Sequence, residues 1–168
     1  MVDILTYYDQ HPINEHAVHE SLLRERKSLE HLVPEDLFSY DQDHYGGLDA
    51  VDALVRCASI GAGDRVLDVC SGLGGPARYL AHRHGCSVTG IDINRSRALA
   101  SRRLTRRVGL QNKVSFVCGN ATRMPFLNES FTRIVSQEAF LHVGNKVALF
   151  SNCHRVLITG GCFVFTDW

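Results

Sequence analysis

Five short apolar runs, separated by longer segments with helical periodicity, dominate the pattern of hydrophobic and polar positions along the chain. In the intervening segments, apolar residues recur three and four positions apart, as on the buried face of an amphipathic helix. Strands that alternate with helices predict an α/β fold with a mainly parallel, doubly wound sheet. We expect its strands at residues 65–70, 86–92, 113–119, 131–137 and 160–167.

The residues before the first apolar run have a different character. Helical periodicity covers residues 13–32 and is broken near Pro34, and a second helix is expected at residues 48–59. We therefore expect two parts, an N-terminal helical segment at residues 1–46 and a core domain at residues 47–168.

A glycine-rich turn follows the first apolar run. The run ends near Asp68, and Gly72 and Gly74 occupy positions where a missing Cβ lets the backbone approach a ligand before a helix begins. The first N–H groups of such a helix are free to bind a ligand. The second run ends in Asp92, 20 positions after Gly72, the separation typical of a carboxylate that binds ribose hydroxyls. The two loops together predict a nucleoside site.

Two kinds of nucleoside cofactor are compatible with this turn. The pattern Gly72-x-Gly74-x-x-Ala77 also fits the fingerprint of NAD-dependent oxidoreductases. However, the Asp68 carboxylate would repel a pyrophosphate, and Pro76 stiffens the start of the helix. S-adenosylmethionine (SAM) carries a sulfonium, an ammonium and a single carboxylate, so the acid favours it. SAM is therefore the predicted cofactor, and a nicotinamide cofactor is the alternative.

With these motifs, the chain resembles class I SAM-dependent methyltransferases over residues 45–168. The resemblance depends on D-x-C-x-G-x-G at residues 68–74, the acid Asp92 after the second strand, and a third loop with the pair Pro125-Phe126. It implies a Rossmann-like sheet with the strand order 3-2-1-4-5. Compared with the family, we expect a core without the C-terminal β-hairpin.

Two positions depart from the family pattern. Cys70 stands where the family usually has its first glycine, and Asn120 stands where many members have an aspartate near the adenine amino group. A small thiol fits the first position, and an amide oxygen still accepts a hydrogen bond at the second, so donor binding is expected despite both changes.

The resemblance also implies which residues bind the donor. The turn after the first strand holds the methionyl end, the loops after the second and third strands hold ribose and adenine, and the end of the fourth strand lies near the donor. The residues are Asp68, Gly72, Gly74 and Gly75 for the methionyl end, Asp92 and Ile93 for ribose and adenine, Asn120 and Ala121 for adenine, and Gln137 at the fourth strand. Cys70 and Ser71 of the same turn are also expected to bind the donor.

The acceptor is predicted to be a small molecule, most simply an amine. Residues 136–142, Lys146 and residues 165–167 look most like glycine, sarcosine and dimethylglycine N-methyltransferases, with phosphoethanolamine and quinone-ring methyltransferases as close alternatives. An aliphatic amine is mostly protonated near neutral pH, so its methylation needs a base or a pocket that lowers its pKa. The candidate catalytic groups are Glu138, His142 and Tyr45.

The segment before the core is expected to act as a lid, because residues 38–47 correspond to a segment that often covers donor and acceptor in methyltransferases. Tyr40, His44 and Tyr45 are its candidate acceptor-facing residues, although aromatic loop residues more often serve packing. His16 and His19 lie on one helix face without a third ligand, so no metal site is expected.

Composition narrows the function classes further. The chain has 168 residues and a net charge of zero, and no run approaches the roughly 18 apolar residues of a membrane span. Without a signal peptide pattern, we expect a cytoplasmic protein whose six cysteines are reduced. Residues 1–60 hold 12 acids against 4 Lys or Arg, which leaves 6 against 14 in residues 61–168, so the two parts should attract each other. A basic helix face after Asp92 fits solvation better than nucleic-acid binding; it comprises Arg95, Arg102, Arg103 and Arg106.

The fifth apolar run, which ends near Trp168, predicts an uncovered edge strand. We expect a fragment of a longer enzyme, a chain that forms a homo-oligomer through this edge, or a reduced relative that binds SAM without turnover. The function classes are therefore a small-molecule methyltransferase, a non-catalytic SAM-binding or partner module, and a nicotinamide oxidoreductase. A quinone or lipid-ring acceptor is the alternative within the first class.

Overall fold

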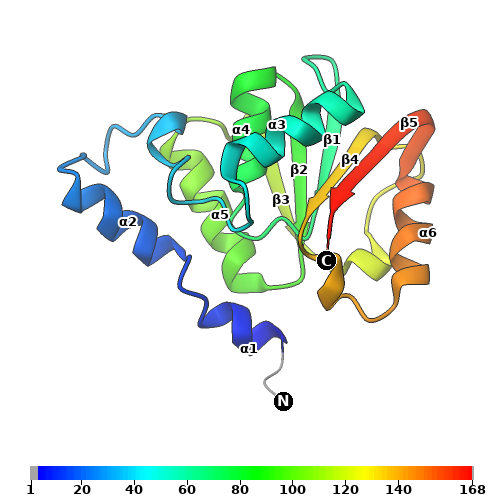
Figure 1. Ribbon diagram of the computed structural model, residues 1–168, viewed down its shortest axis with the longest axis horizontal. Helices are drawn as coiled ribbons and strands as arrows, with labels where there is room; N and C mark the ends of the chain where they lie inside the picture. Colours follow the sequence, from blue (N-terminus) through cyan, green and yellow to red (C-terminus); the bar gives the residue numbers. More distant parts are fainter. Residues whose placement is uncertain (1–3, 168) are drawn as a thin grey trace.

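A computed structural model describes residues 4–167, which form a five-stranded sheet flanked by helices (Figure 1). Residues 1–3 and 168 of the two predicted parts lie outside the described residues. All four strand pairs are parallel, and the order is β3-β2-β1-β4-β5, which confirms the predicted topology. The strands are β1 (Arg65–Val69), β2 (Ser87–Asp92), β3 (Val114–Cys118), β4 (Phe131–Gln137) and β5 (Leu157–Thr166).

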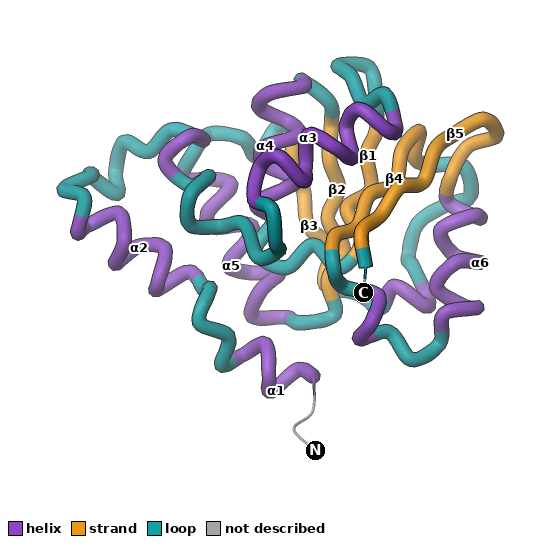
Figure 2. The backbone as a smooth tube through the Cα atoms, in the orientation of Figure 1, coloured by secondary structure: helices purple, strands orange, loops and turns teal. Residues whose placement is uncertain are grey.

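Helices cover both faces of this sheet, as Figure 2 shows. On one face, α3 (Gly47–Ala58) and α4 (Gly75–His84) pack against alternate residues of the strands, among them Val66 and Val88. On the other face, α6 (Lys146–Val156) packs against Leu67 and Ile134. Strands that are buried on both faces need continuous apolar runs, which is why the sequence located them well.

The helix α5 (Arg95–Arg107) begins where the chain leaves β2. The Asn94 side chain caps its N-terminus by accepting a hydrogen bond from the Arg97 N–H at 3.0 Å. This cap places the first turn of α5 beside the carboxyl ends of β1 and β2, so that Arg97 lies next to the glycine-rich turn.

The N-terminal segment contains α1 (Ile4–Asp9) and α2 (Glu15–Arg24), which lie along the α5 side of the core (Figure 1). Val18 and Leu22 of α2 pack against Leu104 of α5 in an apolar cluster of their own. The prediction of one helix at residues 13–32 is wrong at its end, because the chain leaves the helix at Glu25 and Arg26 takes a left-handed φ of 60°. The apolar pattern continues past this point because the following loop also contributes to the cluster.

Charge attraction between the two parts is visible in their contacts. The exposed Arg103 of α5 pairs with Glu15 of α2. Within the core itself, Arg102 donates to the Phe116 carbonyl oxygen at 3.0 Å. Two predicted members of a basic face are thus engaged within the protein.

The strand β5 forms one edge of the sheet and pairs with β4 alone. Phe163 and Phe165 stack beside Phe140 and Phe150, and Phe165 is still 44% exposed.

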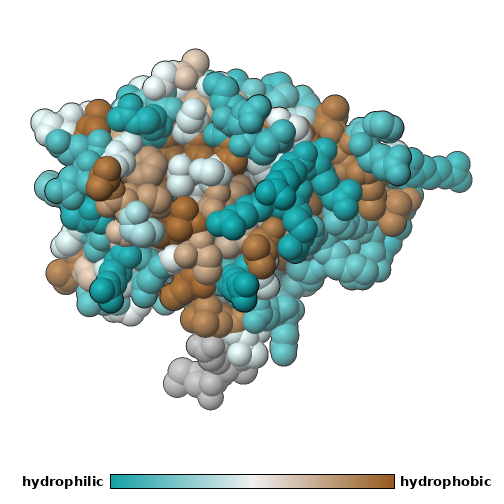
Figure 3. All heavy atoms as spheres, turned by 180° about the vertical axis from the view of Figure 1, so that it is seen from behind, coloured by the Kyte–Doolittle hydropathy of each residue, from teal (hydrophilic) through white to brown (hydrophobic). Residues whose placement is uncertain are grey.

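Seen from behind, apolar residues gather in the middle of the molecule between hydrophilic borders (Figure 3).

Neither a disulfide nor a metal cluster is found among residues 4–167, in which all six cysteines are free. No helix in the same range is long and apolar enough to cross a membrane.

Candidate functional site

A cavity of about 350 Å³ lies at the carboxyl ends of β1, β2 and β4. The strand order reverses direction between β1 and β4, and the crevice at such a switch point is where open α/β sheets bind ligands. The loops that follow β1, β2, β3 and β4 all contribute to the lining, together with residues of the N-terminal segment.

The turn after β1 is held in a left-handed conformation. Cys70 has φ 61° and Gly72 has φ 52°, and the Gly74 N–H donates to the Ser71 carbonyl oxygen at 2.8 Å. A residue other than glycine is strained in the left-handed conformation. The backbone at Cys70 therefore explains why the family pattern usually has a glycine at this position. The turn brings Cys70, Ser71 and Gly72 into the cavity lining.

Gly74 and Gly75 are needed for packing. A Cβ at Gly74 would overlap the ring of Phe116, and one at Gly75 would overlap the Asp41 carbonyl oxygen. Neither glycine belongs to the cavity lining, so the structure does not bring these two predicted donor residues to the site.

Asp92 links the two loops on either side of the cavity. One carboxylate oxygen accepts from the Gly72 N–H and the other from the Asn94 N–H, both at 2.8 Å. Burial raises the pKa of Asp92, and these two hydrogen bonds oppose the effect. Asn94 in turn donates to Asp9 at 3.0 Å and to the Leu5 carbonyl oxygen at 3.2 Å, which attaches α1 to the rim of the cavity.

Several buried polar atoms of the lining have no hydrogen-bond partner among the described residues. They include Asp68 Oδ2, Ser71 Oγ and Gln137 Oε1. Burial, with a smaller contribution from Asp92, raises the pKa of Asp68 to about 7. Buried polar groups in proteins are nearly always hydrogen-bonded, so these three atoms indicate that a polar ligand belongs in the cavity.

The loop after β3 forms the far wall. Asn120 and Ala121 line the cavity, and the Asn120 side-chain oxygen accepts from the N–H and hydroxyl of Thr122 at 2.8 Å. Ile93 also lines it and is half exposed.

Comparison with known proteins decides the family. Residues 67–165 match the family model described as a methyltransferase domain, which is more than half of the chain. This chain belongs to the methyltransferase domain family. The match confirms the resemblance predicted from the glycine-rich turn and Asp92.

Individual relatives agree on the family and differ in their acceptors. A sarcosine/dimethylglycine N-methyltransferase from Aphanothece halophytica is 39% identical over 63% of this chain and 38% of its own length. A sterol 24-C-methyltransferase from Eremothecium gossypii is 36% identical over 68% of this chain and 31% of its own length. The chain thus spans about a third of the length of these curated relatives.

A solved structure has the same fold as nearly all of the present chain. Phosphoethanolamine N-methyltransferase 2 from Haemonchus contortus, in complex with S-adenosyl-L-methionine, has a TM-score of 0.76 at 22% identity. The likeness covers 98% of this chain and 35% of that chain, so it includes the N-terminal segment.

Of the three predicted catalytic groups in this methyltransferase domain, two line the cavity. Glu138 and His142 belong to the lining, whereas Tyr45 is 74% exposed and lies outside it. Both carboxylate oxygens of Glu138 accept from the Tyr45 backbone N–H at 3.1 Å. Burial lowers the pKa of His142, so its imidazole is neutral near pH 7.

Residues 41–45, which we call the strap, cross the cavity and are fixed at both ends. At one end, Asp41 forms a fully buried ion pair of 2.8 Å with Arg78 of α4; at the other, the Tyr45 N–H meets Glu138. His44, a predicted lid residue, lines the cavity and lies 3.2 Å from the Gln137 side-chain nitrogen. Tyr40 contacts Glu25 and is not part of the lining.

The sequence did not reveal the contribution of α1 and α5. Ile4, Leu5 and Tyr8 of α1 line the cavity, and so do Asp43 of the strap and Arg97 of α5. A six-residue helix has too few positions for a periodic signal. Arg97 offered one clue, because it lies three positions after the cap residue Asn94 and therefore in the first turn of α5, on the same face of the helix as the cap.

Proposed function

We propose that this chain binds SAM in the cavity and transfers its methyl group to a small-molecule acceptor. The observation that carries the proposal is the set of buried, partnerless oxygens of Asp68, Ser71 and Gln137 at the switch point, beside the Asp92 carboxylate. A cationic donor complements the two aspartates, whereas a pyrophosphate would face them with like charge. The relatives named as methyltransferases support the same reaction class.

The residues present fit the donor. Asp68, Cys70, Ser71 and Gly72 would hold its methionyl end, Asp92 with Ile93 the ribose, and the loop after β3 the adenine through Asn120 and Ala121. Gln137 would face the donor from β4. Gly74 and Gly75 support this arrangement by allowing close packing of the turn.

The bound donor supplies an electrophilic methyl group on sulfur. The protein then has to align the acceptor with that methyl group and exclude water. His142 is the favoured base for an amine acceptor, because it is neutral and lines the cavity; Glu138 is occupied by the Tyr45 backbone, and the Tyr45 ring lies outside. An amine such as a glycine derivative is the proposed acceptor, and a sterol-like or quinone-ring lipid is the alternative.

The proposal also covers the division of the chain into two parts and its location in the cell. Residues 1–46 form a lid segment, and residues 47–168 form the donor-binding core. The enzyme acts on a small molecule in the cytoplasm and does not bind nucleic acid.

Titration calorimetry with S-adenosylhomocysteine, the demethylated product, tests the donor site, with NADH as the competing ligand. We expect S-adenosylhomocysteine to bind and NADH not to bind. Asp92→Ala should weaken binding of S-adenosylhomocysteine at least tenfold, because it removes the carboxylate that is proposed to hold the ribose and that accepts hydrogen bonds from the Gly72 and Asn94 N–H groups. Asp49→Ala, an exposed acid on α3, is the matched control and should bind as the unmodified chain does. Binding of NADH instead would overturn the proposal.

Methyl transfer itself needs a second measurement. Radiolabelled SAM with sarcosine, phosphoethanolamine and a sterol as acceptors would show transfer to one class. Donor binding without transfer to any acceptor would favour the non-catalytic SAM-binding module.

A further inference from the structure

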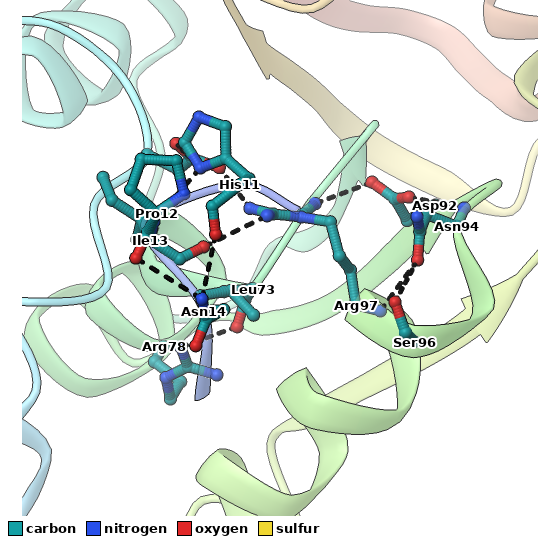
Figure 4. A network of polar contacts seen from close by, with 12 residues as sticks. His11, Pro12, Ile13, Asn14, Leu73, Arg78, Asp92, Asn94, Ser96 and Arg97 are labelled. Atoms are coloured by element: carbon teal, nitrogen blue, oxygen red, sulfur yellow. Dashed lines mark hydrogen bonds and ion pairs between the residues drawn. The ribbon is translucent and has the colours of Figure 1, made fainter. Parts of the chain in front are cut away.

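Arg97 is a buried cation in the wall of the cavity. It is 4% exposed, although it belongs to α5, whose other arginines mostly face solvent. Its side chain reaches from α5 towards His11 and Ile13, with Asp92 and Asn94 on the other side of its stem (Figure 4). Such a position is costly for a charge unless partners compensate for the loss of water.

Among the described residues, the hydrogen-bond, ion-pair and ring partners of the Arg97 guanidinium belong to the N-terminal segment. Nη2 pairs with Asp43 of the strap, Nη1 donates to the Ile13 carbonyl oxygen at 3.2 Å, and the guanidinium carbon lies 5.2 Å from the centre of the Tyr8 ring. One side chain of the core therefore contacts the strap, the linker after α1, and α1 itself. The Nε atom is buried without a hydrogen-bond partner among the described residues.

The same guanidinium also lies beside the turn after β1. A Cβ placed on Gly72 would lie 3.1 Å from Arg97 Nη2, and the Gly72 N–H is bound to Asp92. Arg97 thus lies between the strap and the turn, both of which line the cavity.

The strap depends on Arg97 at its centre. Its two ends are fixed by Arg78 and Glu138, and Asp43 is the carboxylate between them. The carboxylates Asp43 and Glu15 are similarly exposed, at 20% and 18%, but the Arg97 side chain is 4% exposed against 53% for Arg103. The Arg97–Asp43 pair is therefore screened by solvent less than the Arg103–Glu15 pair.

We propose that Arg97 is a positioning residue that holds the strap and α1 over the donor cavity and thereby slows release of the donor. The proposal rests on the proposed SAM-binding function. Arg97 acts through Asp43, Ile13 and Tyr8, so its removal should loosen the cover while leaving Asp68, Asp92 and Asn120 in place.

Stopped-flow measurement of S-adenosylhomocysteine release tests this role in the full chain. Arg97→Met and Asp43→Asn should each release the ligand about tenfold faster, since each removes a charge-assisted hydrogen bond. The double variant should accelerate release by less than the product of the two single effects, because both substitutions remove the same Arg97–Asp43 pair. Arg97→Lys keeps the charge and should restore part of the slow release.

Arg103→Met is the matched control. It removes an arginine of the same helix that also contacts the N-terminal segment, through Glu15 of α2, but lies away from the cavity. We expect its release rate to stay within a factor of about two of the unmodified chain, as for other exposed pairs.

The outcomes separate the two proposals. If the unmodified chain binds no S-adenosylhomocysteine, the proposed function itself fails. If it binds and Arg97→Met and Asp43→Asn release the ligand at the unmodified rate, Arg97 has no positioning role. An equal acceleration in Arg103→Met would also overturn the proposal, since the effect would then be general loosening. Should Arg97→Met fail to fold in a thermal melt, Asp43→Asn tests the same pair from its more exposed side.

Discussion

Two residues beside the cavity that are not glycine adopt the left-handed backbone conformation, Cys70 with φ 61° and Glu138 with φ 51°. Strained residues persist where the surroundings fix them, and they concentrate at functional sites. Cys70→Gly and Cys70→Ala both remove the thiol, but only glycine also relieves the strain. We expect the glycine variant to be more stable than the alanine variant by about 1 kcal/mol in urea unfolding. Equal stabilities would show that the backbone relaxes at this position.

The carboxyl of Asp68 gives stability a particular pH dependence. Its pKa is about 7 in the folded protein against 3.8 ordinarily, so between these values the folded state retains a proton that the unfolded state loses. Stability from this group is therefore full below about pH 4 and is lost as pH rises through about 7. Urea unfolding from pH 4 to 8 should show this decline, and Asp68→Asn should reduce it. A variant with an unchanged slope would assign the decline to other groups.

At the scale of elements, the buried ion pair between the strap and α4 should dominate local stability. Arg78 is fully buried and pairs with Asp41. It also donates to the Leu73 carbonyl oxygen at 2.7 Å, and both of these residues are labelled in Figure 4. Arg78→Met leaves the Asp41 carboxylate buried without its cation and should lower the free energy of unfolding by about 3–5 kcal/mol. Adding Asp41→Asn should recover part of the loss. Denaturant midpoints of the two variants check both expectations.

Sequence patterns located the strands better than the N-terminal helices for physical reasons. A strand buried on both faces, such as β1 with Val66, Leu67 and Val69, is mostly apolar, and turn residues follow its end. The helix after Asn14 ended eight residues before the predicted limit, at Arg24, because loop leucines continued its apolar pattern. Motif residues that line the cavity were found from spacing, whereas Arg97 and Tyr8 reach it only through the packing of distant segments.

At the scale of the whole molecule, the free edge of β5 and its exposed aromatic residues make self-association a testable expectation. Phe165 and Phe150 are 44% and 40% exposed beside an edge that pairs with no strand of the described chain. We propose that the chain forms a homo-oligomer through this edge, and that Phe165→Lys weakens it, because edge charges oppose strand pairing. Sedimentation equilibrium over a range of concentrations measures the effect. A chain that is monomeric throughout would exclude this assembly.

The strap has a further consequence for how the protein can vary. Its alternate residues Asp41, Asp43 and Tyr45 contact α4, α5 and the loop after β4, so its length is matched to the distances between these three parts of the core. Most surface loops tolerate insertions. In this loop, one added residue between Asp41 and Asp43 would separate a carboxylate from its arginine even though every side chain were retained. Exchange of side chains at Gln42 should be tolerated far better than any change in the number of residues.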